Sequence, residues 1–264
     1  MRTQSKKELQ DRLARASKAL HLSVVQQNAA RIAIESERQQ RGYLAYLVEL
    51  LEAQLEERRR NRATRRIKEA GFPVVKTLES FDFSKAKKLP ETRIRRLFDG
   101  GYIDEAEPVI FIGEPGTGKT HLATALGEAA ARSGKRVKFI TAAALVTELV
   151  EARDAEELAR TVARYGRTEV LIIDELAYIP LSKSDAELLF RILGDRNERQ
   201  PTIITTNLPF SEWTSMFPDH RLCRAILDRL THKAHIIETG TESIRLRSTL
   251  AKRENRSLKE SGRS

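Results

Sequence analysis

The chain has 264 residues, of which 40% are hydrophobic, and a formal net charge of +10. This length is enough for one sizeable core and a smaller domain. No apolar run approaches the roughly 18–20 residues that span a bilayer, and no apolar stretch follows the charged N-terminus, so we expect a cytoplasmic protein without a membrane partner. Cys223 is the single cysteine, which excludes an intrachain disulfide and a cysteine-based zinc site.

The positive charge is concentrated at the two ends of the chain. Residues 1–76 hold 17 Lys and Arg against 9 Asp and Glu, and residues 245–264 hold 7 against 2, whereas the long middle stretch is close to neutral. Such an asymmetry favours a polyanionic partner, most simply nucleic acid, that is contacted by the terminal regions. The alternative interpretation is that the basic ends only keep the protein soluble.

Residues 1–70 are predicted to form a small all-helical domain, because residues 3–70 contain no proline and their leucines recur at helical spacing. The second long helix ends in an arginine-rich stretch, after which Gly71 and Pro73 stop the pattern. Seven cations within eleven residues repel one another more than the helix dipole offsets, so an external phosphate backbone explains them better. The expected DNA contacts are Arg58, Arg59, Arg60, Arg62, Arg65, Arg66 and Lys68, together with the basic residues of 245–263.

Residues 71–107 break the helical pattern with prolines and glycines and are predicted to form a connector, which carries the sequence FDFSKAKKL. Beyond it, short β-branched runs alternate with segments of helical composition such as 121–134. The predicted strands are 108–113, 136–141, 169–174, 202–207 and 234–240. Apolar strands that alternate with helices predict an α/β domain over 108–250, in which helices flank a parallel sheet, followed by a basic tail over 251–264.

The first predicted strand runs directly into GEPGTGKT, which matches the P-loop pattern G-x-x-x-x-G-K-[ST], and a helical pattern follows at once. Its glycines let the backbone curl around phosphate groups with N–H groups pointing inward. Lys119 is expected to reach the β- and γ-phosphates of ATP, and the Thr120 hydroxyl to hold Mg²⁺. The expected nucleotide-binding segment comprises Gly113, Glu114, Pro115, Gly116, Thr117, Gly118, Lys119, Thr120 and His121.

Two further polar strand ends complete the predicted hydrolysis site. The sequence EVLIIDEL places Asp174 at the C-terminal end of a buried strand, where ligands bind in open α/β sheets, and Asp174 is expected to hold Mg²⁺ directly or through water. Glu175 is the candidate general base that polarises water for attack on the γ-phosphorus; an exposed carboxylate without a role is its alternative. Asn207 ends the next strand and is expected to orient the same water, although such an Asn is ordinarily a turn residue.

The order of P-loop, acidic pair and polar strand end resembles that of the AAA+ class of P-loop ATPases. More specifically, the chain resembles the IstB-type ATPase helper proteins of bacterial insertion sequences, which are relatives of the DnaC helicase loaders. The resemblance covers about residues 70–250. The segments that carry it are FDF (81–83), GEPGTGKTHLATALG (113–127), LIIDEL (171–176), TTNLPFSEW (205–213) and AILDRLTHKAHII (225–237).

This resemblance implies an AAA+ core that assembles as a homo-oligomer on duplex DNA with little sequence preference, deforms the duplex and directs a partner transposase to a target. It also implies that adenine lies near Phe81, Asp82 and Phe83, with core packing as the alternative role of Phe83. A DnaC-like replicative helicase loader is the main alternative function. A nucleotide-switched DNA-binding scaffold that does not hydrolyse ATP is another.

Two arginines complete the site that the resemblance implies. Arg229 in LDRL is expected to act on the nucleotide of the neighbouring subunit, and Arg245 in ESIRLR to sense the nucleotide of its own subunit. Arg224 and Arg247 are the rival assignments. A guanidinium that arrives from a neighbour stabilises the charge that develops as the γ-phosphoryl group leaves, so hydrolysis is expected to depend on assembly.

Overall fold

The structure of the protein is a computed structural model that describes residues 5–86, 89–176, 181–215, 217, 219–241 and 243. The chain divides into two compact units, Met1–Arg65 and Arg66–Ser264, which are described separately. In the described part, no helix combines the length and the apolar character that a membrane crossing requires.

The first unit is built from helices, as the sequence predicts. These are α1 (Lys6–Ala19), α2 (Ser23–Arg38) and α3 (Tyr43–Ala70), of which α3 is 28 residues long, continues past the boundary of the unit and ends in the arginine-rich segment. Helix α1 starts at a capping box in which Ser5 accepts a hydrogen bond from the backbone N–H of Glu8, and the Glu8 carboxylate accepts one from the N–H of Ser5.

A small core joins α2 to α3 in this unit. Its buried members are Val25, Ala29, Ile32 and Leu50. Two polar side chains of α3 reinforce the contact: buried Gln54 accepts a hydrogen bond of 3.0 Å from the N–H of Val24, and the Tyr46 hydroxyl donates one of 3.2 Å to the carbonyl of Ala29. Since such a core is small, we expect this unit to be less stable than the second.

The second unit is an α/β domain whose strands lie within one residue of the predicted boundaries. The strands are β1 (Val109–Gly113), β2 (Val137–Thr141), β3 (Val170–Asp174), β4 (Thr202–Thr206) and β5 (His235–Gly240). The helices are α4 (Glu91–Leu97), α5 (Gly101–Asp104), α6 (Lys119–Arg132), α7 (Ala142–Asp154), α8 (Leu158–Gly166), α9 (Lys183–Arg196) and α10 (His220–Thr231), with 3₁₀ turns η1 (Phe83–Lys85) and η2 (Phe210–Ser215).

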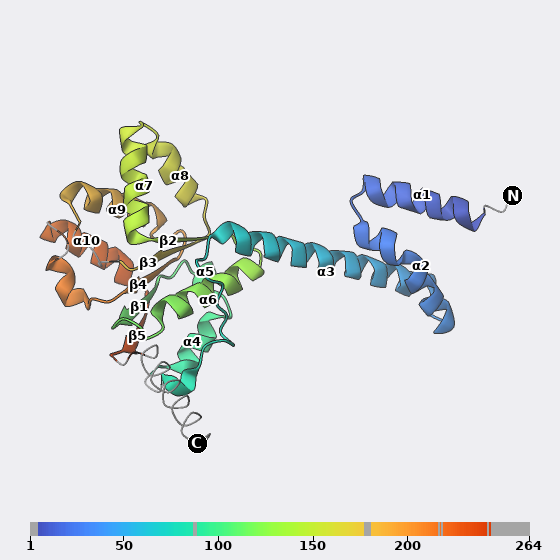
Figure 1. Ribbon diagram of the computed structural model, residues 1–264, viewed down its shortest axis with the longest axis horizontal. Helices are drawn as coiled ribbons and strands as arrows, with labels where there is room; N and C mark the ends of the chain where they lie inside the picture. Colours follow the sequence, from blue (N-terminus) through green and yellow to red (C-terminus); the bar gives the residue numbers. More distant parts are fainter. Residues whose placement is uncertain are drawn as a thin grey trace, which may run out of the picture. The chain divides into compact units, whose positions relative to one another are not determined.

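All five strands pair in parallel, in the order β2-β3-β4-β1-β5 (Figure 1). Helices cover both faces, and alternate strand residues divide between two cores because successive side chains of a strand point to opposite faces. The core beside α7 to α10 contains Ile110, Leu171, Ile173 and Ile204. The core beside α4 to α6 contains Val109, Phe111, Ile172, Ile203 and Ile237. The predicted fold, a parallel sheet flanked by helices, is confirmed.

Short helices occupy part of residues 71–107, for which the sequence predicts only a connector. Pro90 forms the N-cap of α4, and Gly100, with a φ of +89°, forms the N-cap of α5. Proline is compatible with the start of a helix, and glycine readily adopts positive φ, so these residues begin helices here. Ile94 of α4 and Tyr102 of α5 are buried in the core beside α6.

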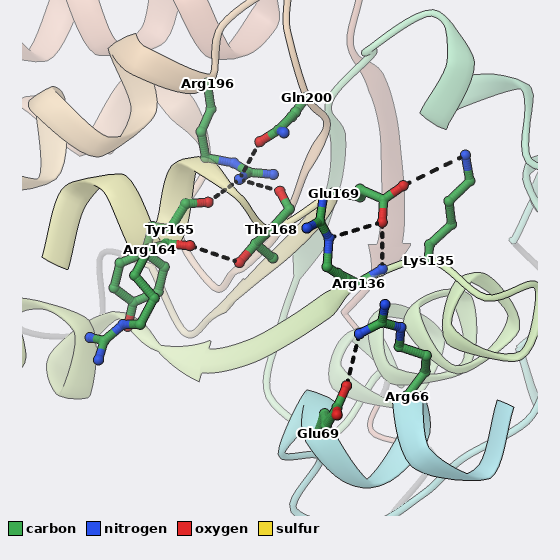
Figure 2. A network of polar contacts seen from close by, with 10 residues as sticks. All are labelled: Arg66, Glu69, Lys135, Arg136, Arg164, Tyr165, Thr168, Glu169, Arg196 and Gln200. Carbon is green, nitrogen blue, oxygen red and sulfur yellow. Dashed lines mark hydrogen bonds and ion pairs between the residues drawn. The ribbon is translucent and has the colours of Figure 1, made fainter. Parts of the chain in front are cut away.

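A buried arginine ties the start of β4 to the end of α8. Arg196 is only 2% exposed, and burial lowers the pKa of its guanidinium to about 10, which leaves it charged at neutral pH. Figure 2 shows part of its network. Its guanidinium donates to the carbonyls of Tyr165, Thr168 and Pro201 at 2.8 Å, to Oε1 of Gln200 at 3.0 Å and to Oγ1 of Thr202 at 3.3 Å. Backbone carbonyls thus satisfy most of its donors.

Candidate ATP-binding and hydrolysis site

The predicted site residues of three strands meet at the carboxyl edge of the sheet. Strand β4 lies between β1 and β3, with Ile112 opposite Thr206 and Ile173 opposite Ile204. The P-loop after β1, the acidic pair at the end of β3 and the polar end of β4 therefore lie side by side. This is the edge at which open parallel sheets bind their ligands.

The P-loop leads from β1 into α6 through left-handed glycines. Gly116 has a φ of +83° and Gly118, the N-cap of α6, has a φ of +100°, a region in which side chains are unfavourable. Helix α6 begins at Lys119, so the N–H groups of its first turn and the positive end of its dipole face the loop. The geometry suits a polyphosphate.

Lys119 is 6% exposed, and its ammonium group lies over the loop itself. It donates hydrogen bonds to the carbonyl of Gly113 at 2.6 Å and to that of Glu114 at 2.9 Å. These contacts hold the charge inside the curve of the P-loop, where phosphate oxygens are expected to bind. A lysine is a flexible point charge, so it can exchange these carbonyls for phosphate without moving the backbone.

A row of hydroxyl and carboxylate groups joins the start of α6 to the ends of β3 and β4. The Thr120 hydroxyl donates to Oδ1 and Oδ2 of Asp174 at 3.0 and 3.3 Å. From the other side, the Thr205 hydroxyl donates to Oδ1 of Asp174 at 2.6 Å. Asp174 is 5% exposed, and its oxygens and the Thr120 hydroxyl form a set of hard oxygen donors that fits Mg²⁺. Thr205 lies in the quoted TTN segment, but the sequence did not assign it a role.

Glu175 follows β3 with a backbone conformation that is unfavourable for its residue type. Its φ is +59°, and the other described non-glycine residues with positive φ all follow the ends of helices. Its N–H donates to the Thr205 hydroxyl at 2.9 Å, which fixes this turn, while its side chain is exposed beside the P-loop edge. Such conformations are typically retained at functional sites. This favours a catalytic role for Glu175 over that of an exposed carboxylate without a function.

Asn207 directly follows β4 and is half-buried at the same edge. The two residues before it are anchored: Thr205 to Asp174 as above, and Thr206 by its hydroxyl, which accepts from the N–H of Leu208 at 3.2 Å. A strand end anchored in this way restricts the backbone of Asn207. The role of its amide in orienting water stays a prediction.

Strand β5 supports the P-loop from the far side, which the sequence did not predict. The hydroxyls of Thr117 and Thr239 lie 2.6 Å apart, and the N–H of Glu114 donates to the carbonyl of Gly240 at 3.1 Å. A Cβ on Gly113 would collide with Thr239 and with the backbone of Gly240. The glycine at the first P-loop position thus also permits close approach of β5.

The FDF segment lies next to α6, but its three side chains differ in their surroundings. Phe81 is buried against the ring of His121, at 5.1 Å between centroids, and packs edge-on against Phe83 at 4.9 Å. Asp82 is exposed and caps η1, and its hydrogen bond from Ser84 lowers the pKa of its carboxyl to about 2. Phe81 therefore has a core-packing role, and contact of this segment with adenine stays a prediction.

His121 attaches the connector to the start of α6. Its Nε2 lies 3.2 Å from the carbonyl of Thr77 and 3.1 Å from the Ser80 hydroxyl. Burial lowers the pKa of the ring, with the Lys76 charge a smaller contribution in the same direction. His121 is thus neutral near pH 7. The structure gives it a role in holding residues 77–81 beside the P-loop helix, and a direct nucleotide contact stays a prediction.

The predicted arginines lie in different places. Arg229 is half-buried on α10, with its guanidinium carbon 4.1 Å from the centroid of the Phe190 ring of α9, whereas Arg224 is exposed. Ile226 and Leu230 are buried on the core side of α10, and Leu227 is half-buried. Arg245 and its rival Arg247 lie outside the described residues, as do the other basic residues of 245–263.

The arginine-rich part of α3 is largely exposed. The exposed cations are Arg58, Arg59, Arg60, Arg62, Arg65 and Lys68, whereas Arg66 is half-buried and pairs with Glu69 at 2.9 Å (Figure 2). Arg58 reaches back to the carbonyls of Leu20 and His21 at 3.4 and 3.3 Å. Arg59 and Arg60 form distant ion pairs, at 4.0 and 3.8 Å, and their side chains are 77% and 67% exposed, which leaves them accessible to a phosphate backbone.

Comparison with known proteins identifies the family. Residues 15–252 match the family model of the IstB-like ATP binding protein. A protein of Pseudomonas aeruginosa named as an ATP-binding protein of insertion sequence IS21 is 38% identical over 206 residues, 78% of either chain. One of Geobacillus stearothermophilus, named for insertion sequence IS5376, is 36% identical over 239 residues, 90% of this chain and 95% of its own.

Among solved structures, AMPPCP-bound DnaA from Aquifex aeolicus shares the fold, with a TM-score of 0.51 and 21% identity over 61% of this chain and 49% of its own. The family model and these relatives confirm the sequence-based recognition. The chain belongs to the IstB-like ATP binding protein family and is an ATP-binding P-loop ATPase with an AAA+ fold.

Proposed function

We propose that this ATPase regulates transposition: with ATP bound it assembles on duplex DNA, deforms the duplex and delivers a partner transposase to the target, and hydrolysis resets the assembly. The observation that carries the proposal is the exposed cationic end of α3, in a chain that also brings the P-loop, Thr120 and Asp174 together at one edge of its sheet. The names of its relatives, which refer to insertion sequences, support a transposase as the partner.

The residues at the carboxyl edge of the sheet have separate roles in hydrolysis. Lys119 and the first turn of α6 bind the phosphates, and Thr120 and Asp174 hold Mg²⁺. When bound, Mg²⁺ neutralises charge on the phosphate oxygens. Glu175 accepts a proton from the attacking water, and Asn207 orients that water. Because Thr205 bonds both the carboxylate of Asp174 and the backbone N–H of Glu175, the metal-binding carboxylate and the backbone of the proton-accepting residue are held together.

Arg229 completes the site of a neighbouring subunit, so that turnover requires a homo-oligomer. As the γ-phosphoryl group leaves, its oxygens gain charge, which a guanidinium supplied from outside stabilises; such a group raises the rate by about 10³–10⁵. Arg229 is half-buried, and its guanidinium lies against the Phe190 ring, which leaves part of it accessible to a neighbouring subunit. Arg245 is proposed to sense the nucleotide within its own subunit.

Duplex DNA is contacted through phosphates. The cations of α3 follow one another along a helix, and arginine pairs well with phosphate oxygens. Phosphate contacts position a protein without reading bases, so little sequence preference and a steep salt dependence follow. Assembly of several subunits multiplies these contacts, and their binding free energy offsets the cost of bending the duplex.

The test is a binding measurement with duplex and single-stranded DNA of equal length, in the presence of ADP or of a non-hydrolysable ATP analogue. The proposal expects duplex binding that is strong with the analogue and weak with ADP. Tighter binding to the single strand, or capture of a replicative helicase in place of a transposase, supports the loader alternative and contradicts the proposal. Glu175→Gln serves as control: it is expected to keep ATP-dependent duplex binding and to lose hydrolysis.

A further inference from the structure

Gly194 lies inside α9, where a glycine is less favourable than an alanine because its backbone loses more freedom. A Cβ built on Gly194 would lie 2.5 Å from Nη1 of Arg229 and 3.5 Å from its Cζ. The missing side chain therefore leaves the space that the guanidinium of Arg229 fills. Since the obstructing atoms are the end of a flexible side chain, an alanine would displace the guanidinium and leave α9 in place.

Phe190 precedes Gly194 by four residues and so lies on the same face of α9, one turn earlier. Its ring centroid is 4.1 Å from the guanidinium carbon of Arg229, well within the range of a cation–π contact. Phe190 and Gly194 together form a seat for one side chain of α10, and the two residues are called the arginine seat below. The ring fixes one face of the guanidinium, and the glycine fixes how close its edge comes to the helix.

The arginine seat opens onto a polar hollow of about 430 Å³. The hollow is lined by Gly194, Asp195, Asn197, Glu198, Arg199 and Arg229, of which Asp195, Glu198 and Arg199 are exposed. The guanidinium therefore rests at a solvent-accessible surface that a second copy of the chain can reach. A side chain already held in one orientation loses less freedom when it meets its target.

We propose that Phe190 and Gly194 are positioning residues for hydrolysis in trans: they hold Arg229 in the orientation from which it meets the nucleotide of a neighbouring subunit. The inference rests on the proposed function, specifically on the action of Arg229 across a subunit interface. It assigns to the surface around the hollow a single partner, the nucleotide-bearing face of a second copy of this chain.

The test uses mixed subunits. Glu175→Gln subunits keep Arg229 but cannot hydrolyse ATP, whereas Arg229→Ala subunits can hydrolyse ATP only with an arginine from a neighbour. Turnover per subunit is measured for the mixture on duplex DNA, with Gly194→Ala or Phe190→Leu added to one population at a time. In the Glu175→Gln population, each change is expected to lower the restored turnover by about three- to tenfold. In the Arg229→Ala population, neither change is expected to matter.

Two controls separate positioning from folding. Gly166→Ala adds the same methyl group to the last residue of α8, where nothing lies within 4 Å, and is expected to leave turnover unchanged. Phe190→Tyr keeps an aromatic ring and is expected to restore the turnover that Phe190→Leu loses. The thermal midpoint of Gly194→Ala is expected to equal or exceed that of the wild type, because alanine favours the helix.

The outcomes distinguish the two levels of the proposal. If mixing restores no turnover at all, the role of Arg229 in trans is wrong. If mixing restores turnover and Gly194→Ala has no effect in the donor subunits, or the same effect in both populations, only the role of the arginine seat is overturned. An increase in turnover with Phe190→Leu would also overturn it, because the ring would then restrain Arg229.

Discussion

The hydroxyl of Thr205 donates a hydrogen bond of 2.6 Å to Oδ1 of Asp174, at the boundary between β3 and β4. The same hydroxyl accepts the N–H of Glu175 at 2.9 Å. One buried side chain thus connects the two acidic residues that the sequence assigns to Mg²⁺ and to water. The Thr205 hydroxyl is both a donor and an acceptor. Valine has nearly the same shape as threonine but can do neither.

We therefore expect Thr205→Val to lower ATP turnover about 10- to 100-fold, because a hydrogen bond to a charged group contributes about 1.5–3 kcal/mol. The measurement is steady-state turnover at saturating ATP and Mg²⁺. Thr205→Ser keeps the hydroxyl and is expected to stay within a few-fold of the wild type. Thr147→Val removes an exposed hydroxyl that bonds only within α7 in the described structure, and is the matched control that should leave turnover unchanged. Equal turnover of Thr205→Val and wild type would exclude this role.

Arg196→Met is expected to destabilise the second unit by about 3 kcal/mol or more. The substitution keeps an apolar stem but removes the charged donor that bonds the carbonyls of Tyr165, Thr168 and Pro201, and a hydrogen bond to a charged group contributes about 1.5–3 kcal/mol. The carbonyls of Tyr165 and Pro201 keep backbone donors, the N–H groups of Thr168 and Leu171, so the total loss is smaller than the sum of three such bonds. For a unit of this size the thermal midpoint should fall by roughly 6–12 °C. Arg136→Met, at an exposed site, should change it little; a shift no larger than that of this control would contradict the account of Arg196.

His121 predicts a pH dependence of stability. Its folded pKa lies below the ordinary value of 6.5, so the unfolded chain takes up a proton first as the pH falls. The stabilisation is complete above pH 6.5 and is lost as the pH falls through the folded pKa. Thermal midpoints at pH 7.5, 6.5 and 5.5 should therefore fall more steeply for the wild type than for His121→Gln. Replacement of exposed His220 by Gln should not change the slope; parallel curves for His121→Gln and wild type would refute the prediction.

The cations of α3 predict a change in the salt dependence of duplex binding. The double variant Arg59→Ala, Arg60→Ala removes two exposed charges and should flatten the slope of log affinity against log salt concentration by about two, at roughly 0.9 for each phosphate contact. Arg160→Ala with Arg167→Ala removes the same charge from exposed positions of α8 and its C-cap. An equal change of slope in both double variants would mean that net charge, and not this surface, governs binding.

The sequence predicted the sheet closely because its strands are short runs rich in β-branched residues, and β3 and β4 are buried on both faces. It also predicted the P-loop and the acidic pair, since those positions require particular residue types at fixed spacing. The short helices α4 and α5 were missed, because Pro90 and Gly100 signal breaks in a pattern and, here, start helices. Proline and glycine positions in a sequence show reliably where a long helix ends. They do not show whether a short helix begins at the same place.

The missed site residues are those whose roles depend on contacts between distant segments. Thr205 and Thr239 are ordinary strand threonines until the register of the sheet brings them to Asp174 and Thr117. Gly194 carries no signal beyond an unfavourable glycine in a helix, and its partner Arg229 lies 35 residues further along the chain. Arg196 gives no sequence signal for burial, because an isolated arginine is usually exposed.

The central claim, that ATP turnover requires neighbouring subunits assembled on DNA, is tested most directly by turnover per subunit as a function of protein concentration with duplex DNA present. The account predicts that turnover of the wild type rises with concentration to a plateau, whereas Arg229→Ala remains low at every concentration while still binding ATP. Turnover that is independent of concentration, and equal in wild type and Arg229→Ala, would contradict it.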